Sequence, residues 1–272
     1  MISPSSCFIL HLQYDIYRII SKGQVSWKKC IFALRKFSSM PSLLSEICQG
    51  FAGLFWPNVC TCCSTGLTYG EQYVCSHCLY ELPMTHFHKV DDNPVAQIFW
   101  GRASVEHATA GYFFRKGNNI QKLVHQVKYK GQKEMGTVLG REMGKSLCES
   151  SFADIDLIVP VPLHPQKFRK RGYNQSEWIA RGVAEVLDKP VDVETVERHF
   201  FTDTQTRKKR FDRWENVDSG FRLVRPETFA GRHILLIDDV ITTGATLEAC
   251  IHAVLSAPEC KVSVATLAFA SA

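Results

Sequence analysis

The stretch that decides the fold is Ile234-Leu-Leu-Ile-Asp-Asp-Val-Ile-Thr-Thr-Gly-Ala-Thr246. Its four aliphatic residues predict a strand that is buried on both faces of a parallel sheet. Two carboxylates, Asp238 and Asp239, end that strand, and a small-residue turn from Thr242 to Thr246 follows. A helix should begin at the turn, because apolar residues then recur with helical spacing: Leu247, Cys250, Ile251, Val254 and Leu255. Strand, hydroxyl-and-glycine turn and helix together are typical of a phosphate site built from backbone N–H groups.

The acidic pair narrows the choice of ligand. Two carboxylates beside a phosphate would repel it, unless they bind another part of the same molecule, such as ribose hydroxyls or a divalent cation. A ligand with a 5′-phosphate, a sugar diol and Mg²⁺ suits this layout. The stretch resembles the phosphoribosyl pyrophosphate (PRPP) loop of type I phosphoribosyltransferases. The alternative interpretation is a buried strand that ends in a solvated pair of aspartates.

Length and composition indicate a globular protein with one large domain and a small module. The chain has 272 residues, of which 45% are hydrophobic and 22% charged, which indicates a globular rather than a disordered protein. The net charge of +5 permits a polyanionic partner without requiring one. No apolar run approaches the ~20 residues that span a bilayer.

The first 39 residues are apolar in places but share no periodic face with the residues after them. Met40 begins a segment with helical spacing of apolar residues that Pro57 stops. We therefore hypothesise that Met40 is the true start and that residues 1–39 are an upstream reading-frame extension. A poorly ordered N-terminal tail is the alternative. The opening residues lack the basic start and continuous apolar core of a signal peptide, so we expect a reducing, cytoplasmic location.

Four of the eleven cysteines form two close pairs. Cys60 and Cys63 make one Cys-x-x-Cys knuckle, Cys75 and Cys78 make another, and eleven residues separate the two. Four thiolates in this pattern predict a structural Zn²⁺ site in a zinc ribbon. The ribbon and the helix before it are expected to make up residues 40–84. A redox Cys-x-x-Cys is the alternative. Other side chains that could replace a ligand are Cys62, His77, His86 and His88.

Residues 85–100 are rich in turn formers and charge, which predicts a linker. The large domain is expected over residues 101–272, with a strand at 110–114 and helices at 120–129 and 134–147. The second of these helices contains Gly140-Arg-Glu-Met-Gly-Lys-Ser146, a near miss for a P-loop. It has three residues between the glycines where four are needed, and we interpret it as helix surface.

Residues 156–164 predict a second buried strand, which prolines interrupt where it would leave the sheet. The stretch from Lys167 to Ser176 reads as a basic loop, and a helix should run from Gln175 to Leu187. Cations and Gly172 after a parallel strand suit pyrophosphate, although a solvated charge cluster is the alternative. Strands are also expected at 193–200 and 262–269, with a polar, basic segment at 202–216 that suits a mobile lid or a nucleic-acid contact.

Five motifs occur in one order: the two knuckles, Pro-Val-Pro-Leu-His164, Arg171-Gly-Tyr-Asn-Gln-Ser176, Gln205-Thr with later Arg and Asn, and the Asp-Asp stretch. This order resembles the ComF (competence protein F) family from about Met40 to the C-terminus. The resemblance implies an α/β protein, in which a type I phosphoribosyltransferase fold, a central parallel sheet flanked by helices, follows a small N-terminal zinc ribbon.

The same resemblance implies roles for individual residues. Asp238 and Asp239 would hold the ribose 2′- and 3′-hydroxyls, and the turn from Thr242 to Thr246 would hold the 5′-phosphate. The whole PRPP-binding stretch would comprise Asp238, Asp239, Val240, Ile241, Thr242, Thr243, Gly244, Ala245 and Thr246. The pyrophosphate loop would comprise Pro162, Leu163, His164, Lys167, Arg169, Arg171 and Gly172. A flexible loop would contribute Gln205, Thr206, Arg210, Arg213 and Asn216.

Such a site would displace pyrophosphate from ribose C1 with Mg²⁺ and cationic groups stabilising the departing diphosphate. We therefore expect a phosphoribosyltransferase that is linked to DNA uptake or nucleotide metabolism. No residue in the sequence identifies the acceptor of the phosphoribosyl group. The competing hypothesis is a non-catalytic adaptor that binds single-stranded DNA and DNA-processing proteins, with the pocket as a nucleotide sensor.

Overall fold

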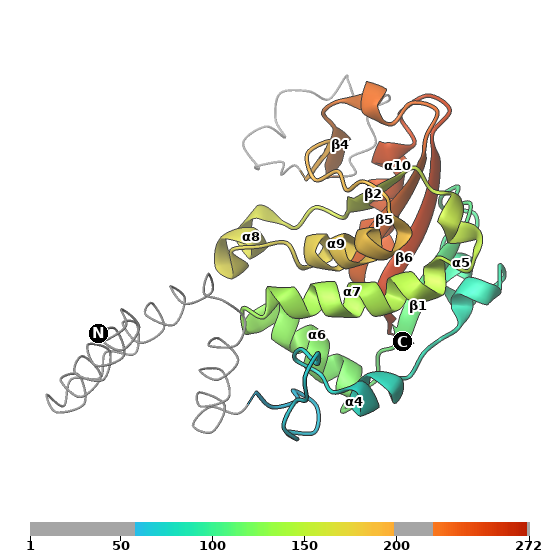
Figure 1. Ribbon diagram of the computed structural model, residues 1–272. Helices are drawn as coiled ribbons and strands as arrows, with labels where there is room; N and C mark the ends of the chain where they lie inside the picture. The colour runs from blue at the N-terminus through green and yellow to red at the C-terminus, as the bar shows by residue number, and fades with distance from the viewer. Residues whose placement is uncertain (1–57, 199–219, 271–272) are drawn as a thin grey trace, which may run out of the picture. The chain divides into compact units, whose positions relative to one another are not determined.

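The structure, a computed structural model, describes residues 58–198 and 220–270 (Figure 1). The hypothesis about residues 1–39 and the helix expected after Met40 lie outside the described residues. The described residues from Val59 onward belong to one compact unit.

Four strands form a parallel sheet in the order β1-β6-β5-β2. Their bounds are β1 Ala108–Phe113, β2 Leu157–Pro160, β5 His233–Ile241 and β6 Lys261–Phe269. The apolar run at the start of β5 is fully buried, as predicted, because β6 and β2 flank the strand and helices cover both faces. Val191 extends the sheet beyond β2 through a single parallel bridge to Ile158.

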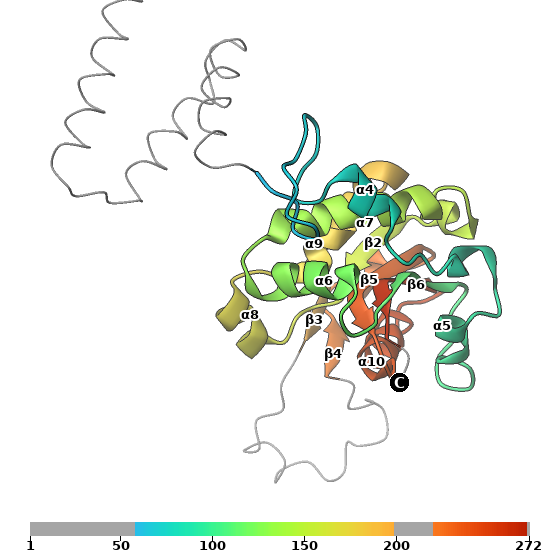
Figure 2. The ribbon, with the colours of Figure 1, turned by 90° about the horizontal axis from the view of Figure 1, so that it is seen from below.

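Side chains alternate along β5 into two separate cores. Leu235 and Ile237 pack with the helices α6 Asn119–Tyr129, α7 Lys133–Leu147 and α9 Gln175–Leu187. Ile234 and Leu236 point to the opposite face, where α10 Ala245–Val254 packs. Figure 2 shows α6 and α7 on one side of the sheet and α10 on the other. The layers are those of a helix-sheet-helix α/β domain.

Helices α7 and α9 lie in close contact because glycines face each other between them. A Cβ added to Gly140 would lie 2.2 Å from the Ile179 carbonyl oxygen, and one added to Gly182 would lie 2.2 Å from the Thr137 carbonyl oxygen. Gly140 and Gly144 are buried. The interpretation of this near-P-loop stretch as helix surface is therefore wrong for its glycines, which let two backbones approach.

The segment expected as a linker, residues 85–100, packs into the domain. Thr85 N–H donates to the Gly111 carbonyl oxygen at 3.0 Å, next to a bridge between Met84 and Tyr112 of β1. Asn93 caps the helix α5 Pro94–Gln97 and donates to the Ala108 carbonyl oxygen at 2.8 Å. The turn formers of this segment hold it along β1, and a 3-10 helix at Phe87–Lys89 precedes α5.

The short strands β3 Val196–Arg198 and β4 Phe221–Leu223 pair antiparallel and lead into and out of residues 199–219. The cysteine-rich segment contains α4 Ser76–Tyr80. The remaining described elements are α8 Pro165–Arg171 and 3-10 helices at Ser151–Asp154 and Pro226–Thr228. No helix in the described ranges is both long and apolar enough to cross a membrane.

Candidate functional site

Asp238 and Asp239 lie at the point where β5 outruns its neighbour β2. The last paired residues are Pro160 and Ile237, after which Val161 N–H donates to the Ile237 carbonyl oxygen at 2.9 Å. The strand itself continues through the acidic pair to Ile241, two residues farther than predicted, because β6 continues to pair with it. The pair thus lies at the carboxyl ends of the parallel strands, just beyond the last residue of β2. This is the edge of the sheet where α/β proteins bind ligands.

Asp238 is held by two donors. Its Oδ1 accepts a hydrogen bond from Ser176 Oγ at 2.8 Å and another from the Asp239 backbone N–H at 2.9 Å. Burial, and after it the negative charge of Asp239, raise the pKa of Asp238 to about 7. Asp238 therefore titrates near neutral pH, and its ionised form can accept hydrogen bonds from a ligand.

Asp239 is buried and forms an ion pair with Lys128 of α6, whose Nζ lies 2.9 Å from Asp239 Oδ2. Oδ2 accepts no hydrogen bond of good geometry among the described residues, so the contact is chiefly electrostatic. Sequence reasoning missed both Lys128 and Ser176. The one sequence signal for Ser176 was its place in the Arg171–Ser176 motif at the start of a helix. No sequence motif pointed to Lys128.

The turn after β5 presents hydroxyl groups at the N-terminus of α10. Thr242, Thr243 and Thr246 are exposed, whereas Gly244 is buried and takes a φ of +76°. A Cβ added to Gly244 would lie 2.4 Å from Ile98 Cγ2, so glycine is required here for both conformation and space. The turn therefore leads directly into a helix, as predicted, and leaves its hydroxyl groups exposed.

Arg102 braces this turn from the segment that follows α5. Its Nη1 donates to the Thr243 carbonyl oxygen at 3.0 Å and to the Ile98 carbonyl oxygen at 3.1 Å. Its Nη2 forms an ion pair with Glu248 in the first turn of α10. Arg102 thus fixes one peptide of the turn and neutralises a carboxylate that would otherwise repel an anion there.

The predicted pyrophosphate loop is partly helical, which corrects the loop expected at residues 167–171. Helix α8 begins after Pro162-Leu-His164, with Pro165 at its start and the His164 side chain accepting from the Gln166 N–H at 3.1 Å. Gly172, with a φ of +79°, ends it. The exposed residues of α8 that were predicted to bind pyrophosphate are Lys167 and Arg169.

The Arg171 side chain contacts residues of α9 and α6. Its Nη1 donates to Gln175 Oε1 at 2.7 Å, and its guanidinium lies over the Tyr129 ring, 5.1 Å from the centroid. The pKa of His164 is lowered by partial burial and then by the positive charges of Arg198 and Lys167. Lys167 and Arg198 thus supply positive charge around His164, at the carboxyl end of β2.

The motif that follows α8 joins three elements around the acidic pair. Asn174 Nδ2 donates to the Val161 carbonyl oxygen at 3.0 Å, and its Oδ1 accepts from the Ser176 N–H at the start of α9. The Tyr173 hydroxyl donates to the Val127 carbonyl oxygen of α6. The predicted flexible-loop residues lie outside the described residues: Gln205, Thr206, Arg210, Arg213 and Asn216.

The four predicted zinc ligands come together. The sulfur atoms of Cys60, Cys63, Cys75 and Cys78 all lie within 4.8 Å of one another. Cys60 Sγ accepts backbone N–H bonds from Cys62 at 3.4 Å and Cys75 at 3.3 Å. Four convergent sulfur ligands with N–H···S contacts fit a tetrahedral structural Zn²⁺. In the described part of the chain, Cys62, His77, His86 and His88 are not members of this cluster.

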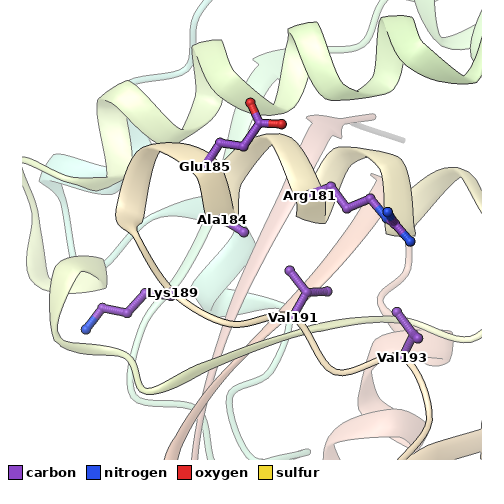
Figure 3. A pocket seen from close by; sticks show the side chains of 6 residues that line it. All are labelled: Arg181, Ala184, Glu185, Lys189, Val191 and Val193. Atoms are coloured by element: carbon purple, nitrogen blue, oxygen red, sulfur yellow. The ribbon is translucent and has the colours of Figure 1, made fainter.

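A separate pocket lies beside α9 and the chain that leads to β3 (Figure 3). No predicted site residue lines it; the lining side chains are Arg181, Ala184, Glu185, Lys189, Val191 and Val193. Glu185 also pairs with Arg141 of α7. The pocket is therefore distinct from the site at the carboxyl end of β5.

Comparison with known proteins identifies relatives of the same kind as the predicted family. Residues 174–272 match the family described as phosphoribosyl transferase domain. The DNA utilization protein YhgH of Escherichia coli (strain K12) is 29% identical over 212 residues, which cover 70% of this chain and 88% of that protein. Competence protein F of Haemophilus influenzae is 39% identical over 93 residues, 34% of this chain and 41% of that protein.

Among solved structures, a purine phosphoribosyltransferase from Pyrococcus horikoshii Ot3 superposes with a TM-score of 0.32 and 19% identity. The match covers 51% of this chain and 73% of that one, and the score is too low for a functional inference. The parallel sheet with helices on both faces and the family match confirm the predicted fold class.

Proposed function

Because this chain is a ComF-family protein with a phosphoribosyltransferase-type domain, we propose that it binds PRPP or a related ribose 5-phosphate ligand at the end of β5. The observation that carries this proposal is the acidic pair placed directly before an exposed hydroxyl turn at a helix N-terminus. One ligand that has both a diol and a phosphate satisfies both halves of that arrangement.

Each part of the ligand has a proposed partner. Asp238 and Asp239 accept hydrogen bonds from the ribose hydroxyls, and the turn from Thr242 to Thr246 binds the 5′-phosphate through N–H and hydroxyl groups. The diphosphate lies toward the positive charges of Lys167 and Arg198, near His164 at the carboxyl end of β2. The acidic pair does not fit a resident Mg²⁺, because Lys128 already neutralises Asp239 and two donors occupy Asp238 Oδ1.

The proposed reaction is phosphoribosyl transfer. An acceptor nucleophile forms a bond to ribose C1 while the bond from C1 to the diphosphate oxygen breaks, through a transition state with oxocarbenium character. The chain contributes binding, orientation and positive charge for the leaving pyrophosphate. Zn²⁺ held by the four cysteines of the cluster would supply structure rather than chemistry.

Calorimetric titration of PRPP tests the proposal. We expect wild type to bind PRPP and Asp238→Asn/Asp239→Asn to lose at least roughly tenfold in affinity, because the diol loses two charged acceptors. If the pair were merely a source of negative charge, its removal would strengthen binding of a polyanion. Asp91→Asn/Asp92→Asn is the matched control, since it removes the same charge from an exposed adjacent pair. Tighter PRPP binding by the site variant than by wild type contradicts the diol role.

A second candidate function is binding of single-stranded DNA, as the relatives named DNA utilization protein and competence protein F suggest. The supporting observation is the surface of α8, where Arg169 and Lys170 are exposed beside Phe168, which is 48% exposed. Cations and an aromatic ring together suit phosphates and stacked bases. Oligothymidylate binding that falls steeply with salt and weakens in Arg169→Gln/Lys170→Gln supports this candidate; binding unaffected by either change contradicts it.

A further inference from the structure

Lys128 occupies a position that the proposed ligand-binding scheme does not explain. It lies near the end of α6, far in sequence from the PRPP loop, yet its Nζ is 2.9 Å from Asp239 Oδ2. Both side chains are mostly buried, with 21% of Lys128 and 9% of Asp239 exposed. A buried carboxylate that lost this partner would be left uncompensated, which is costly.

The residues on either side of Lys128 are held by the segment from Arg171, at the end of α8, to Ser176, at the start of α9. Val127 receives the Tyr173 hydroxyl on its carbonyl oxygen, and the Tyr129 ring lies under the Arg171 guanidinium. The backbone that carries Lys128 is therefore held at the same segment that supplies Ser176 to Asp238. These contacts set the ammonium beside the acidic pair.

With Lys128 in place, the acidic pair is a poor site for a free divalent cation. The ammonium charge lies within contact distance of Asp239 and would repel a metal ion there. Mg²⁺ also requires a near-octahedral set of oxygen ligands. Within the described residues, no third carboxylate, imidazole or thiolate joins the pair, and the cysteine cluster is the one group that could hold a metal ion.

We propose that Lys128 is the resident cation of the acidic pair and a specificity-determining residue. It excludes free divalent ions from Asp238 and Asp239, and so reserves these carboxylates for ligands that bring hydroxyl donors. Lys128 also leaves the pair with one net negative charge instead of two when both aspartates are ionised, which lowers the repulsion that an approaching phosphate meets. A metal ion that accompanies a diphosphate is then bound by the ligand, away from the pair. The inference rests on the proposed function for the identity of that ligand.

Titration of the zinc-loaded protein with Mn²⁺ alone, followed by electron paramagnetic resonance, tests this inference. We expect wild type to show no Mn²⁺ site that depends on Asp238 and Asp239, and Lys128→Met to bind Mn²⁺ roughly tenfold or more tightly than wild type. Methionine preserves most of the length and apolar stem of lysine without its charge. Adding Asp238→Asn to that variant should abolish the new site.

Lys130→Met is the matched control, because Lys130 is exposed at the end of the same helix and should leave Mn²⁺ binding unchanged. Ribose 5-phosphate affinity gives a readout of opposite sign: Lys128→Met should weaken it while strengthening Mn²⁺ binding, whereas a merely structural loss would weaken both. Lys128→Gln serves if the methionine variant does not fold.

Two results would overturn the inference. One is Mn²⁺ bound by wild type at a site lost in Asp238→Asn/Asp239→Asn, which needs no Lys128 variant. The other is a folded Lys128 variant that binds Mn²⁺ no more tightly than Lys130→Met does. Because the probe is the metal alone, these outcomes are independent of PRPP. A wild-type protein that excludes Mn²⁺ and also fails to bind PRPP sinks the proposed function and leaves the role of Lys128 standing.

Discussion

At the scale of single residues, the environment of Asp238 lowers the stability of the folded protein in a way that is consistent with a role in ligand binding. Its burial and the neighbouring charge of Asp239 raise its pKa from 3.8 to about 7, so the folded state disfavours the ionised carboxylate. Ser176 Oγ and the Asp239 N–H offset part of this cost. A carboxyl group whose pKa is shifted by burial and by a neighbouring charge is consistent with a role in binding.

The raised pKa gives a stability prediction with a definite sign. A carboxyl group whose pKa is higher in the folded state contributes stability below about pH 4, and that contribution is lost as pH rises through about 7. Asp238→Asn removes the titration, so its melting temperature relative to wild type should be several degrees higher at pH 8 than at pH 5. Scanning calorimetry at both pH values, with exposed Asp92→Asn as control, measures this. An equal difference at both pH values contradicts the assigned shift.

At the scale of elements, the contact between α7 and α9 depends on glycines. Each added Cβ would overlap a backbone carbonyl oxygen of the opposite helix, which a rotamer change cannot relieve. The contact matters for the site because α9 carries Ser176 at its N-terminus and α7 follows α6, which carries Lys128. Separation of α7 from α9 would therefore displace groups that hold the acidic pair.

Gly182→Ala should destabilise the protein by about 1–3 kcal/mol or more, even though alanine favours a helix by about 1 kcal/mol over glycine. Urea denaturation measures the loss. Gly66→Ala is the control, because an added Cβ there meets nothing within 4 Å and the backbone needs no positive φ. Equal stability of Gly182→Ala and wild type would show that α7 and α9 can separate without cost.

Sequence patterns predicted those elements whose periodicity is strong. Helix α9 has the predicted bounds of Gln175–Leu187, and the apolar run of β5 is buried as expected. Short, mixed patterns were less informative. Helix α8 has seven residues and no buried face, so its charges read as a loop. The segment 85–100 pairs with β1 through backbone atoms, which composition does not record.

The candidate site likewise contains residues that the sequence predicted and residues that it did not. Its acidic pair and hydroxyl turn adjoin in sequence and were predicted together, as were the four cysteines in their two knuckles. Lys128 and Arg102 reach the site from distant segments and carry no motif of their own. A lysine on a helix surface and a lysine beside a buried carboxylate look alike until the fold brings the partner close.

At the scale of the whole molecule, the cysteine-rich segment is continuous with one of the two cores. Cys60, Val74 and Cys78 belong to the same buried cluster as Ile120 of α6 and Leu139 of α7. Leu82 also lies in this cluster, just before the chain pairs with β1. The metal site and the large domain should therefore unfold together rather than as two independent modules.

Zinc removal tests this coupling. We expect one Zn²⁺ per chain by elemental analysis, because four sulfur ligands converge at one point. Chelation, or Cys63→Ser, should lower the temperature of a single calorimetric transition, since loss of the metal opens the core that α6 and α7 share with the knuckles. Cys148→Ser is the control, because Cys148 is an exposed cysteine outside the cluster. Two transitions, with the upper one unmoved by chelation, would instead mean that the large domain closes this core without the metal. The proposed binding site at the end of β5, with Lys128 of α6, would then be independent of zinc, and PRPP titration of the chelated protein would show unchanged affinity.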